Sequence, residues 1–140
     1  MTDDRYDLQR FVEAQDPVFE RVCAELRAGR KTSHWMWFVF PQIRGLGSSE
    51  TSRRYAIGSR EEAAAYLHHA VLGPRLLECA RLLMKVKGRS ALEIFGSADT
   101  LKLKSCMTLF ASVAPDPAPF RAVLETYFDG EMDGATLERL

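Results

Sequence analysis

The sequence predicts an all-α fold: a compact multihelical single domain, residues 1–140, with about seven to nine short helices around a central aromatic helix. Apolar residues recur at helical spacing along most of the chain, and capping residues and glycines interrupt them at short intervals. No segment offers convincing partner strands, and an isolated strand is unstable. With 46% hydrophobic residues, a chain of 140 residues buries enough surface to fold without disulfides or a metal.

Two helices are expected before residue 30. Asp7 caps a helix that begins at Leu8, and Asp16-Pro17 interrupts it because the residue before a proline avoids the helical region. Asp16 then caps the second helix, in which Pro17 suits the first turn. Gly29 ends that helix with left-handed backbone.

Residues 31–42, Lys-Thr-Ser-His-Trp-Met-Trp-Phe-Val-Phe-Pro-Gln, form the most aromatic segment and hold both tryptophans. Periodicity leaves open a buried strand or a buried helix. Length and aromatic enrichment favour a strand, whereas the lack of partner strands favours a short helix. We predict a helix capped by Thr32 or Ser33 and ended near Pro41, covered on most sides because it is apolar all round.

The rest of the chain continues as short helices. A glycine loop leads to a turn of helix at residues 51–55, started by Ser48 or Ser49. Ser59 and Glu62 predict a capping box for the next helix, and residues 68–74 are expected to form a link. The remaining helices are expected at residues 75–86, 90–95, 97–113, 120–128 and 133–140, with Ser97 and Asp133 as caps of the third and the last.

Composition excludes several classes of function. Lys+Arg and Asp+Glu both number 19, so nucleic acid is an unlikely partner. The three cysteines are widely spaced and match neither a disulfide framework nor a zinc site, and the adjacent His68 and His69 do not form a chelate. We expect no metal and no cofactor. Without an apolar N-terminal segment or a membrane span, we expect a cytoplasmic protein with no membrane partner.

Polar residues bracket the aromatic segment at both ends. A helix start at Ser33 with Lys31 beside it could hold an anion, and His34 could exchange protons near neutral pH. Gln42 and Arg44 follow at the other end. The alternative is that Ser33 is simply a cap and His34 a satisfied core histidine.

Three further residues complete the predicted ligand-binding site. Ser49 closes the glycine loop of residues 44–49, which resembles a phosphate cradle in outline but lacks the Lys-Ser/Thr pair of a Walker motif. Arg75 offers a planar fork for a carboxylate or phosphate, and Lys104 adds a charge on the helix of residues 97–113. A tight turn and a buried helix contact are the simpler interpretations of these segments.

Long motifs match a known family residue by residue. They include Lys31-x-Ser33-His34-Trp35-Met36-Trp37-Phe38-x-Phe40-Pro41-Gln42, Gly45-Leu46-Gly47-x-Ser49, Leu72-Gly73-x-Arg75-Leu76, Ile94-Phe95-Gly96, Asp99 with Lys102, and Ser105-x-Met107-Thr108-Leu109-Phe110. On these residues the chain closely resembles domain of unknown function 1810 over nearly its whole length. The resemblance implies a compact multihelical domain and no established activity, so no catalytic residue carries over. Some members carry the label calpastatin, which does not suit a globular chain because the inhibitory repeats of calpastatin are disordered.

We therefore expect an uncharacterised domain that binds a small anionic ligand, such as a nucleotide or a phosphorylated metabolite, in a polar pocket beside the aromatic helix. The ligand-binding residues would be Lys31, Ser33, Gln42, Arg44, Ser49, Arg75 and Lys104, with His34 as the catalytic acid or base if the ligand is processed. The alternative is a protein–protein interaction module with no catalytic activity, in which the polar cluster is structural.

Overall fold

The computed structural model describes residues 4–140, which form ten α-helices, one more than the expected seven to nine. No strand is present within these residues, so the all-α fold class is confirmed. The helices are α1 (Gln9–Gln15), α2 (Phe19–Ala28), α3 (Met36–Val39), α4 (Glu50–Arg54), α5 (Arg60–His68), α6 (Leu72–Lys85), α7 (Ala91–Phe95), α8 (Ser97–Val113), α9 (Ala118–Phe128) and α10 (Gly134–Glu138).

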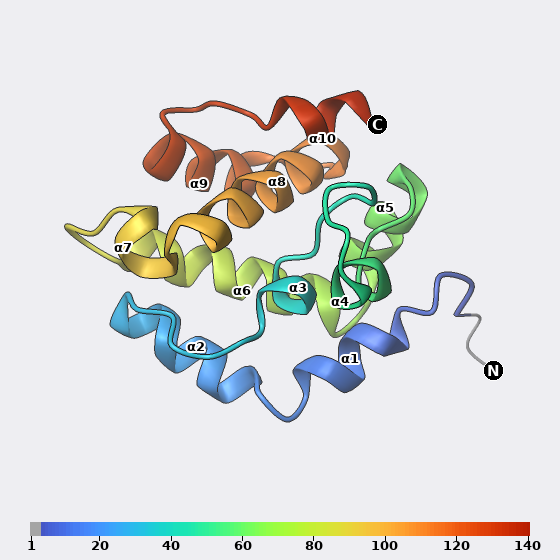
Figure 1. The fold of residues 1–140 in the computed structure, drawn as a ribbon, viewed down its shortest axis with the longest axis horizontal. Coiled ribbons are helices and arrows are strands. Elements are labelled where there is room, and N and C mark those ends of the chain that lie inside the picture. Colours follow the sequence, from blue (N-terminus) through green and yellow to red (C-terminus); the bar gives the residue numbers. More distant parts are fainter. Residues whose placement is uncertain (1–3) are drawn as a thin grey trace.

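Two long helices organise the packing. α8 contacts α5, α7, α9 and α10, while α6 contacts α2, α5 and α9. In Figure 1, α9 and α10 lie above α8, α6 crosses the middle, and α1 and α2 run along the lower edge. The short helix α3 lies between these groups and contacts both α1 and α8. The aromatic segment is thus central, as expected.

The core is continuous and rich in aromatic side chains. Phe11 meets Tyr66 edge-on, with ring centroids 5.2 Å apart, and Tyr66 lies 5.4 Å from Phe110. Pairs at this spacing add to the energy of burial. The largest aromatic side chains below 2% exposure are Phe11, Trp35, Phe40, Tyr66, Phe110 and Phe120. This chain of rings ties the N-terminal helices to α8.

Several predicted helix boundaries are confirmed. Ser49 caps α4, Ser59 caps α5 and Asp133 caps α10, each accepting a hydrogen bond from the backbone N–H three residues on. Gly29 ends α2 with φ +68°. The capping box at α5 is incomplete, because the Glu62 carboxylate accepts from the backbone N–H before Ser59, at 3.0 Å, and not from that of Ser59 itself.

Three predicted caps outside the aromatic segment are wrong. The first N–H groups of α1 bond the carboxylate of Asp4, at 2.6 and 3.0 Å, because Asp7 lies in the left-handed region (φ +51°) outside the helix start. Asp16 does not cap α2, since its backbone is helical at the end of α1 and its carboxylate pairs with Arg75. α8 includes Ser97 as its first residue, so the glycine before it takes the cap position.

α6 begins earlier than the sequence predicts. The expected link over residues 68–74 is shorter, because Leu72 is already helical and Gly73 and Pro74 lie in the first turn. Val71 takes the cap position without a side-chain hydrogen bond, and the His69 ring holds the turn before it, since Nδ1 accepts from the backbone N–H groups of Val71 and Leu72 at 3.1 and 3.2 Å.

The aromatic segment is helical over the four residues Met36–Val39. Neither Thr32 nor Ser33 caps this helix, contrary to the prediction. Trp35 takes the cap position without a side-chain hydrogen bond, because the Ser33 hydroxyl donates to Glu25 of α2. The path of the chain into α3 is therefore set by a contact with a different helix.

Candidate functional site

Glu25 fixes the chain that leads into α3. It is 7% exposed, and its carboxylate accepts four hydrogen bonds: from the backbone N–H of Thr32 at 2.7 Å, from the N–H and hydroxyl of Ser33 at 3.1 and 2.5 Å, and from the Trp35 indole at 3.0 Å. Burial raises the pKa of this carboxyl, but the donors outweigh burial and lower the pKa of Glu25 to about 2. Ser33 is thus engaged by a structural carboxylate.

Lys31 and Lys102 share one carboxylate, that of Asp99 in the first turn of α8. Lys31 Nζ lies 2.8 Å from Oδ2 and Lys102 Nζ 3.0 Å from Oδ1, and the three side chains are between 7% and 21% exposed. Burial raises the pKa of Asp99, but hydrogen bonds and charge from both ammonium groups leave that pKa lowered. Asp99 is therefore ionised at neutral pH. This Lys–Asp–Lys cluster (Lys31, Asp99 and Lys102) carries one positive charge in excess.

Each ammonium group of the Lys–Asp–Lys cluster also lies over an indole ring. Lys31 Nζ is 5.1 Å from the centroid of the Trp35 ring, and Lys102 Nζ is 4.6 Å from that of Trp37. Cations are attracted to the face of an indole at these distances. Trp35 is fully buried, whereas Trp37 is half-buried. The two ammonium groups therefore contact the two indole rings, of which the Trp37 ring stays partly accessible.

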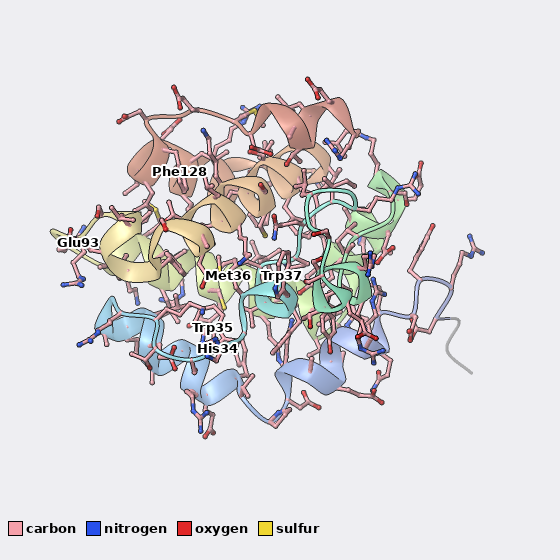
Figure 2. All side chains as sticks on the ribbon, in the orientation of Figure 1. His34, Trp35, Met36, Trp37, Glu93 and Phe128 are labelled. Atoms are coloured by element: carbon pink, nitrogen blue, oxygen red, sulfur yellow. The ribbon has the colours of Figure 1, made fainter. Side chains whose placement is uncertain are left out.

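A pocket of about 320 Å³ lies beside this cluster. Figure 2 labels His34, Trp35 and Trp37 near the middle of the molecule, on α3 and the chain that enters it. The lining residues are Lys31, His34, Trp35, Met36, Trp37, Phe38, Ser49, Thr51, Asp99 and Lys102. Three predicted site residues, Lys31, His34 and Ser49, are thus brought together. His34 is exposed and makes no hydrogen bond to another part of residues 4–140.

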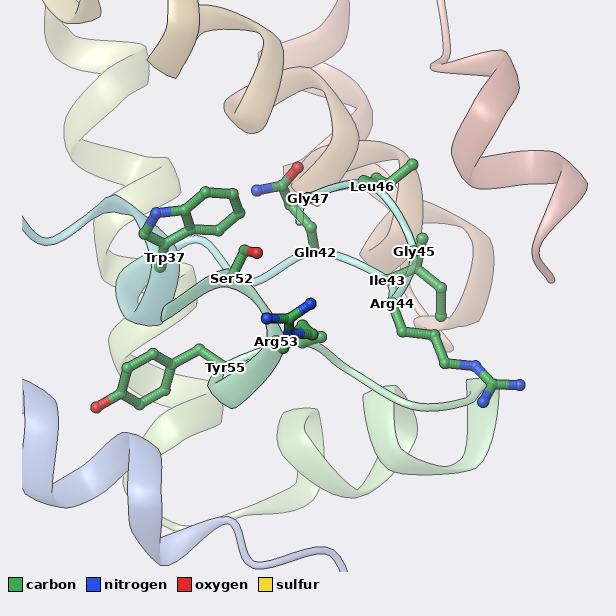
Figure 3. Close-up of a pocket in the computed structure, with 11 residues that line it drawn as sticks. Trp37, Gln42, Ile43, Arg44, Gly45, Leu46, Gly47, Ser52, Arg53 and Tyr55 are labelled. Carbon is green, nitrogen blue, oxygen red and sulfur yellow. The ribbon is translucent and has the colours of Figure 1, made fainter. Parts of the chain in front are cut away.

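Gln42 and Arg44 line a different and smaller cavity of about 90 Å³. It is formed with the loop of residues 43–47 and with α4, and Trp37 lines both this cavity and the larger pocket. Figure 3 shows Trp37, Ser52 and Gln42 around it, while the Arg44 side chain extends away from them. The two polar ends of the aromatic segment therefore belong to two cavities that share one indole.

The remaining predicted residues line neither cavity. Arg75 donates hydrogen bonds to Asp16 Oδ1 at 2.8 Å and to Gln15 Oε1 at 3.3 Å, so its planar fork is used to join α6 to α1 and the turn after it. Lys104 pairs with Glu131 at 3.4 Å. Both are placed as structural ion-pair partners.

The charged residues that sequence reasoning missed at the pocket are Asp99 and Lys102. Their spacing of three residues at a helix start lets the side chains meet, and this signal is readable in the sequence. Lys104 stands two residues further on and faces another side of α8, because positions two apart on a helix point in different directions. The contact of Lys31 with Asp99 has no local signal.

Residues 4–140 contain neither an accessible cysteine nor a metal-binding cluster. Cys23, Cys79 and Cys106 are buried, and burial raises the pKa of each thiol, which makes them poor nucleophiles. Residues 4–140 contain no group of three or more His, Cys, Asp or Glu side chains that could hold a metal ion. None of the helices they form is both long enough and apolar enough to span a bilayer.

Comparisons with known proteins place the chain in a family. A family model described as "Protein of unknown function (DUF1810)" matches residues 5–140. The chain is also similar to a solved structure, that of the conserved hypothetical protein Rv1873 from Mycobacterium tuberculosis, with 57% identity, a TM-score of 0.97 and 98% of each chain covered. No curated protein matches. The chain belongs to the DUF1810 family of proteins of unknown function.

Proposed function

We propose that the pocket beside the Lys–Asp–Lys cluster binds a small anionic ligand, such as a nucleotide or a phosphorylated metabolite. One observation carries this proposal: two ammonium groups share a single ionised carboxylate at the wall of a pocket of about 320 Å³. One positive charge is left without a counter-ion within the cluster, and it attracts an anion from solution.

The other lining residues suit the same class of ligand. The half-buried ring of Trp37 lines the pocket beside Lys102, where a base or another planar group can contact the ring and the ammonium together. The hydroxyls of Ser49 and Thr51 and the ring of His34 supply hydrogen-bonding groups at the rim. A charged group held by the lysines and a planar group on Trp37 together describe a nucleotide better than an inorganic ion.

Binding is better supported than catalysis. A histidine that acts as acid or base is normally oriented by a hydrogen bond to a third group, and His34 has no such partner within residues 4–140. The alternative of a protein interaction module is supported by one apolar groove on α6 and α9, where Leu77 lies with Ala80, Met84, Pro119 and Ala122. No pair of like charges from the described residues adjoins that groove, whereas two lysines share one carboxylate at the pocket beside α3.

Thermal unfolding in the presence of defined probes tests the proposal. AMP and ribose 5-phosphate are added to the full chain, with adenosine as the uncharged counterpart. We expect a rise in Tm that saturates with at least one phosphorylated probe and is absent with adenosine, because binding to the folded state alone stabilises it.

A pair of variants on one helix locates the effect. Lys102→Met removes a pocket charge, whereas Lys104→Met removes a lysine that pairs with Glu131 outside the pocket. The rise in Tm should disappear in Lys102→Met and persist in Lys104→Met. An equal rise in both variants, or no rise with either phosphorylated probe at millimolar concentration, contradicts the proposal.

A further inference from the structure

The side chain of Gln42 is the unusual feature of the smaller cavity. Gln42 is 6% exposed, and its Nε2 group is buried without a hydrogen-bond acceptor among residues 4–140. Buried polar groups are almost always paired, because an unpaired one keeps the full cost of losing its water. This amide therefore calls for an explanation beyond packing.

The backbone holds Gln42 in place firmly. Its carbonyl accepts from the N–H of Ile57 at 2.8 Å, and the N–H of Arg44 donates to the carbonyl of Ile57 at 2.9 Å. These bonds form a parallel bridge between Ile43 and Ile57. The amide is thus presented at the cavity by an ordered piece of chain and not by a loose loop.

The loop of residues 43–47 packs closely against Ser52 and Trp37 on the other side of the cavity. A side chain at Gly47 would place its Cβ 2.7 Å from Cβ of Ser52 and 3.0 Å from Cη2 of Trp37, so this position admits glycine alone without rearrangement. The free space that remains is about 90 Å³, enough for a group of a few heavy atoms and too small for a nucleoside.

The charge around this cavity is positive. Arg44 and Arg53 are among its lining residues, and no acidic side chain of the described chain lines it. Arg53 is exposed, and its guanidinium pairs with no carboxylate in residues 4–140. Figure 3 shows that guanidinium among the lining side chains, between Tyr55 and Arg44. A planar cation and an amide donor without partners thus line the same small cavity, on two sides of Ser52.

We infer that this cavity is a second binding site, for a small oxyanion: a carboxylate or a phosphate group. The Gln42 amide donates a hydrogen bond to one oxygen of the group, and Arg53 neutralises its charge. The site is distinct from the pocket of the Lys–Asp–Lys cluster, with which it shares Trp37. This inference does not depend on whether the larger pocket binds the proposed nucleotide-type ligand.

Amide-detected NMR on the full ¹⁵N-labelled chain tests this inference directly. Sodium phosphate and sodium acetate are titrated separately, at an ionic strength held constant with sodium chloride. We expect saturating shifts of the Gln42 side-chain NH₂ signals and of the Gly47 amide with at least one of the two salts. Saturation with phosphate alone assigns a phosphate site, and saturation with acetate assigns a carboxylate site.

Three variants decide where the anion binds. Arg53→Met changes an exposed side chain and should weaken the apparent affinity at least tenfold. Gln42→Met should abolish the saturating shift at Gly47. Lys104→Met removes a lysine that lines neither cavity, and it should leave both the shift and the affinity unchanged. Linear shifts with both salts, saturation that survives in Gln42→Met and Arg53→Met, or loss of saturation in Lys104→Met would each overturn the inference.

Discussion

Replacing Glu25 with glutamine tests how α2 holds the chain that forms the pocket. The pKa of this carboxyl is about 2 in the folded protein, against an ordinary value of 4.5. Since one unit of pKa corresponds to about 1.4 kcal/mol, ionised Glu25 contributes about 3 kcal/mol to the free energy of unfolding at pH 7. Because the folded pKa is the lower one, this stabilisation is complete above about pH 5 and is lost as the pH falls. About 1 kcal/mol remains at pH 3 and almost none at pH 2.

Urea denaturation at pH 7, 5, 4 and 3, followed by tryptophan fluorescence, measures this contribution. Glu25→Gln should lower the free energy of unfolding by about 3 kcal/mol at pH 7 and by about 1 kcal/mol at pH 3. Glu20→Gln is the matched control, because Glu20 is an exposed carboxylate on the same helix. A loss under about 1 kcal/mol at pH 7, or a loss that is the same at pH 3 as at pH 7, would refute the reasoning.

Three more substitutions probe other contacts of the fold, each measured by urea denaturation at pH 7. Arg10→Lys should lower the free energy of unfolding by about 3 kcal/mol, because the Arg10 side chain is 11% exposed and donates five hydrogen bonds, one of them to Glu62. A single ammonium group cannot replace these bonds, and a loss below about 1 kcal/mol contradicts this role. Gly73→Ala should cost at least about 2 kcal/mol, because a Cβ there collides with the carbonyl oxygen of Leu67, and an unchanged midpoint would show that the collision is relieved. Gln42→Met should raise the free energy of unfolding by about 1 kcal/mol, since it removes an unpaired buried amide, whereas a clear loss would mean that the amide is paired in solution.

Local signals in the sequence were enough for the helices and their order. Ser49, Ser59 and Asp133 start helices, and Gly29 ends one, because capping depends on the hydrogen-bond needs of the nearest turn. The central position of the aromatic segment also followed from composition, since so much apolar area is stable only when it is covered.

Contacts between distant segments set the parts that local signals could not predict. The helix of the aromatic segment starts at Met36 because Glu25, on another helix, captures the three residues that would have begun it earlier. The local sequence predicts Asp16 as a helix cap, but its carboxylate pairs with the guanidinium of Arg75 on α6. A carboxylate or guanidinium has several possible partners, and the packing of helices decides among them.

The residues of the candidate site divide in the same way, into those that local sequence predicts and those that only the fold brings in. Lys31 and His34 lie at the pocket because they flank α3 directly, and Ser49 lies there because the glycine loop folds back over α3. Asp99 was needed to fix the orientation of Lys31, and no pattern in the sequence links two residues so far apart.

Trp35 and Trp37 differ in how far the aromatic segment serves packing alone. If the segment served packing alone, both indoles would be buried and the polar groups at its ends would be paired. Trp35 meets this expectation, with 1% exposure and a hydrogen bond to Glu25. Trp37 does not: it is half-buried, it forms a wall of two cavities, and the unpaired amide of Gln42 lies at one of them. Lys102 over the same ring places a charge at the other. Trp35 therefore belongs to the core, whereas part of the Trp37 ring stays accessible at the two cavities.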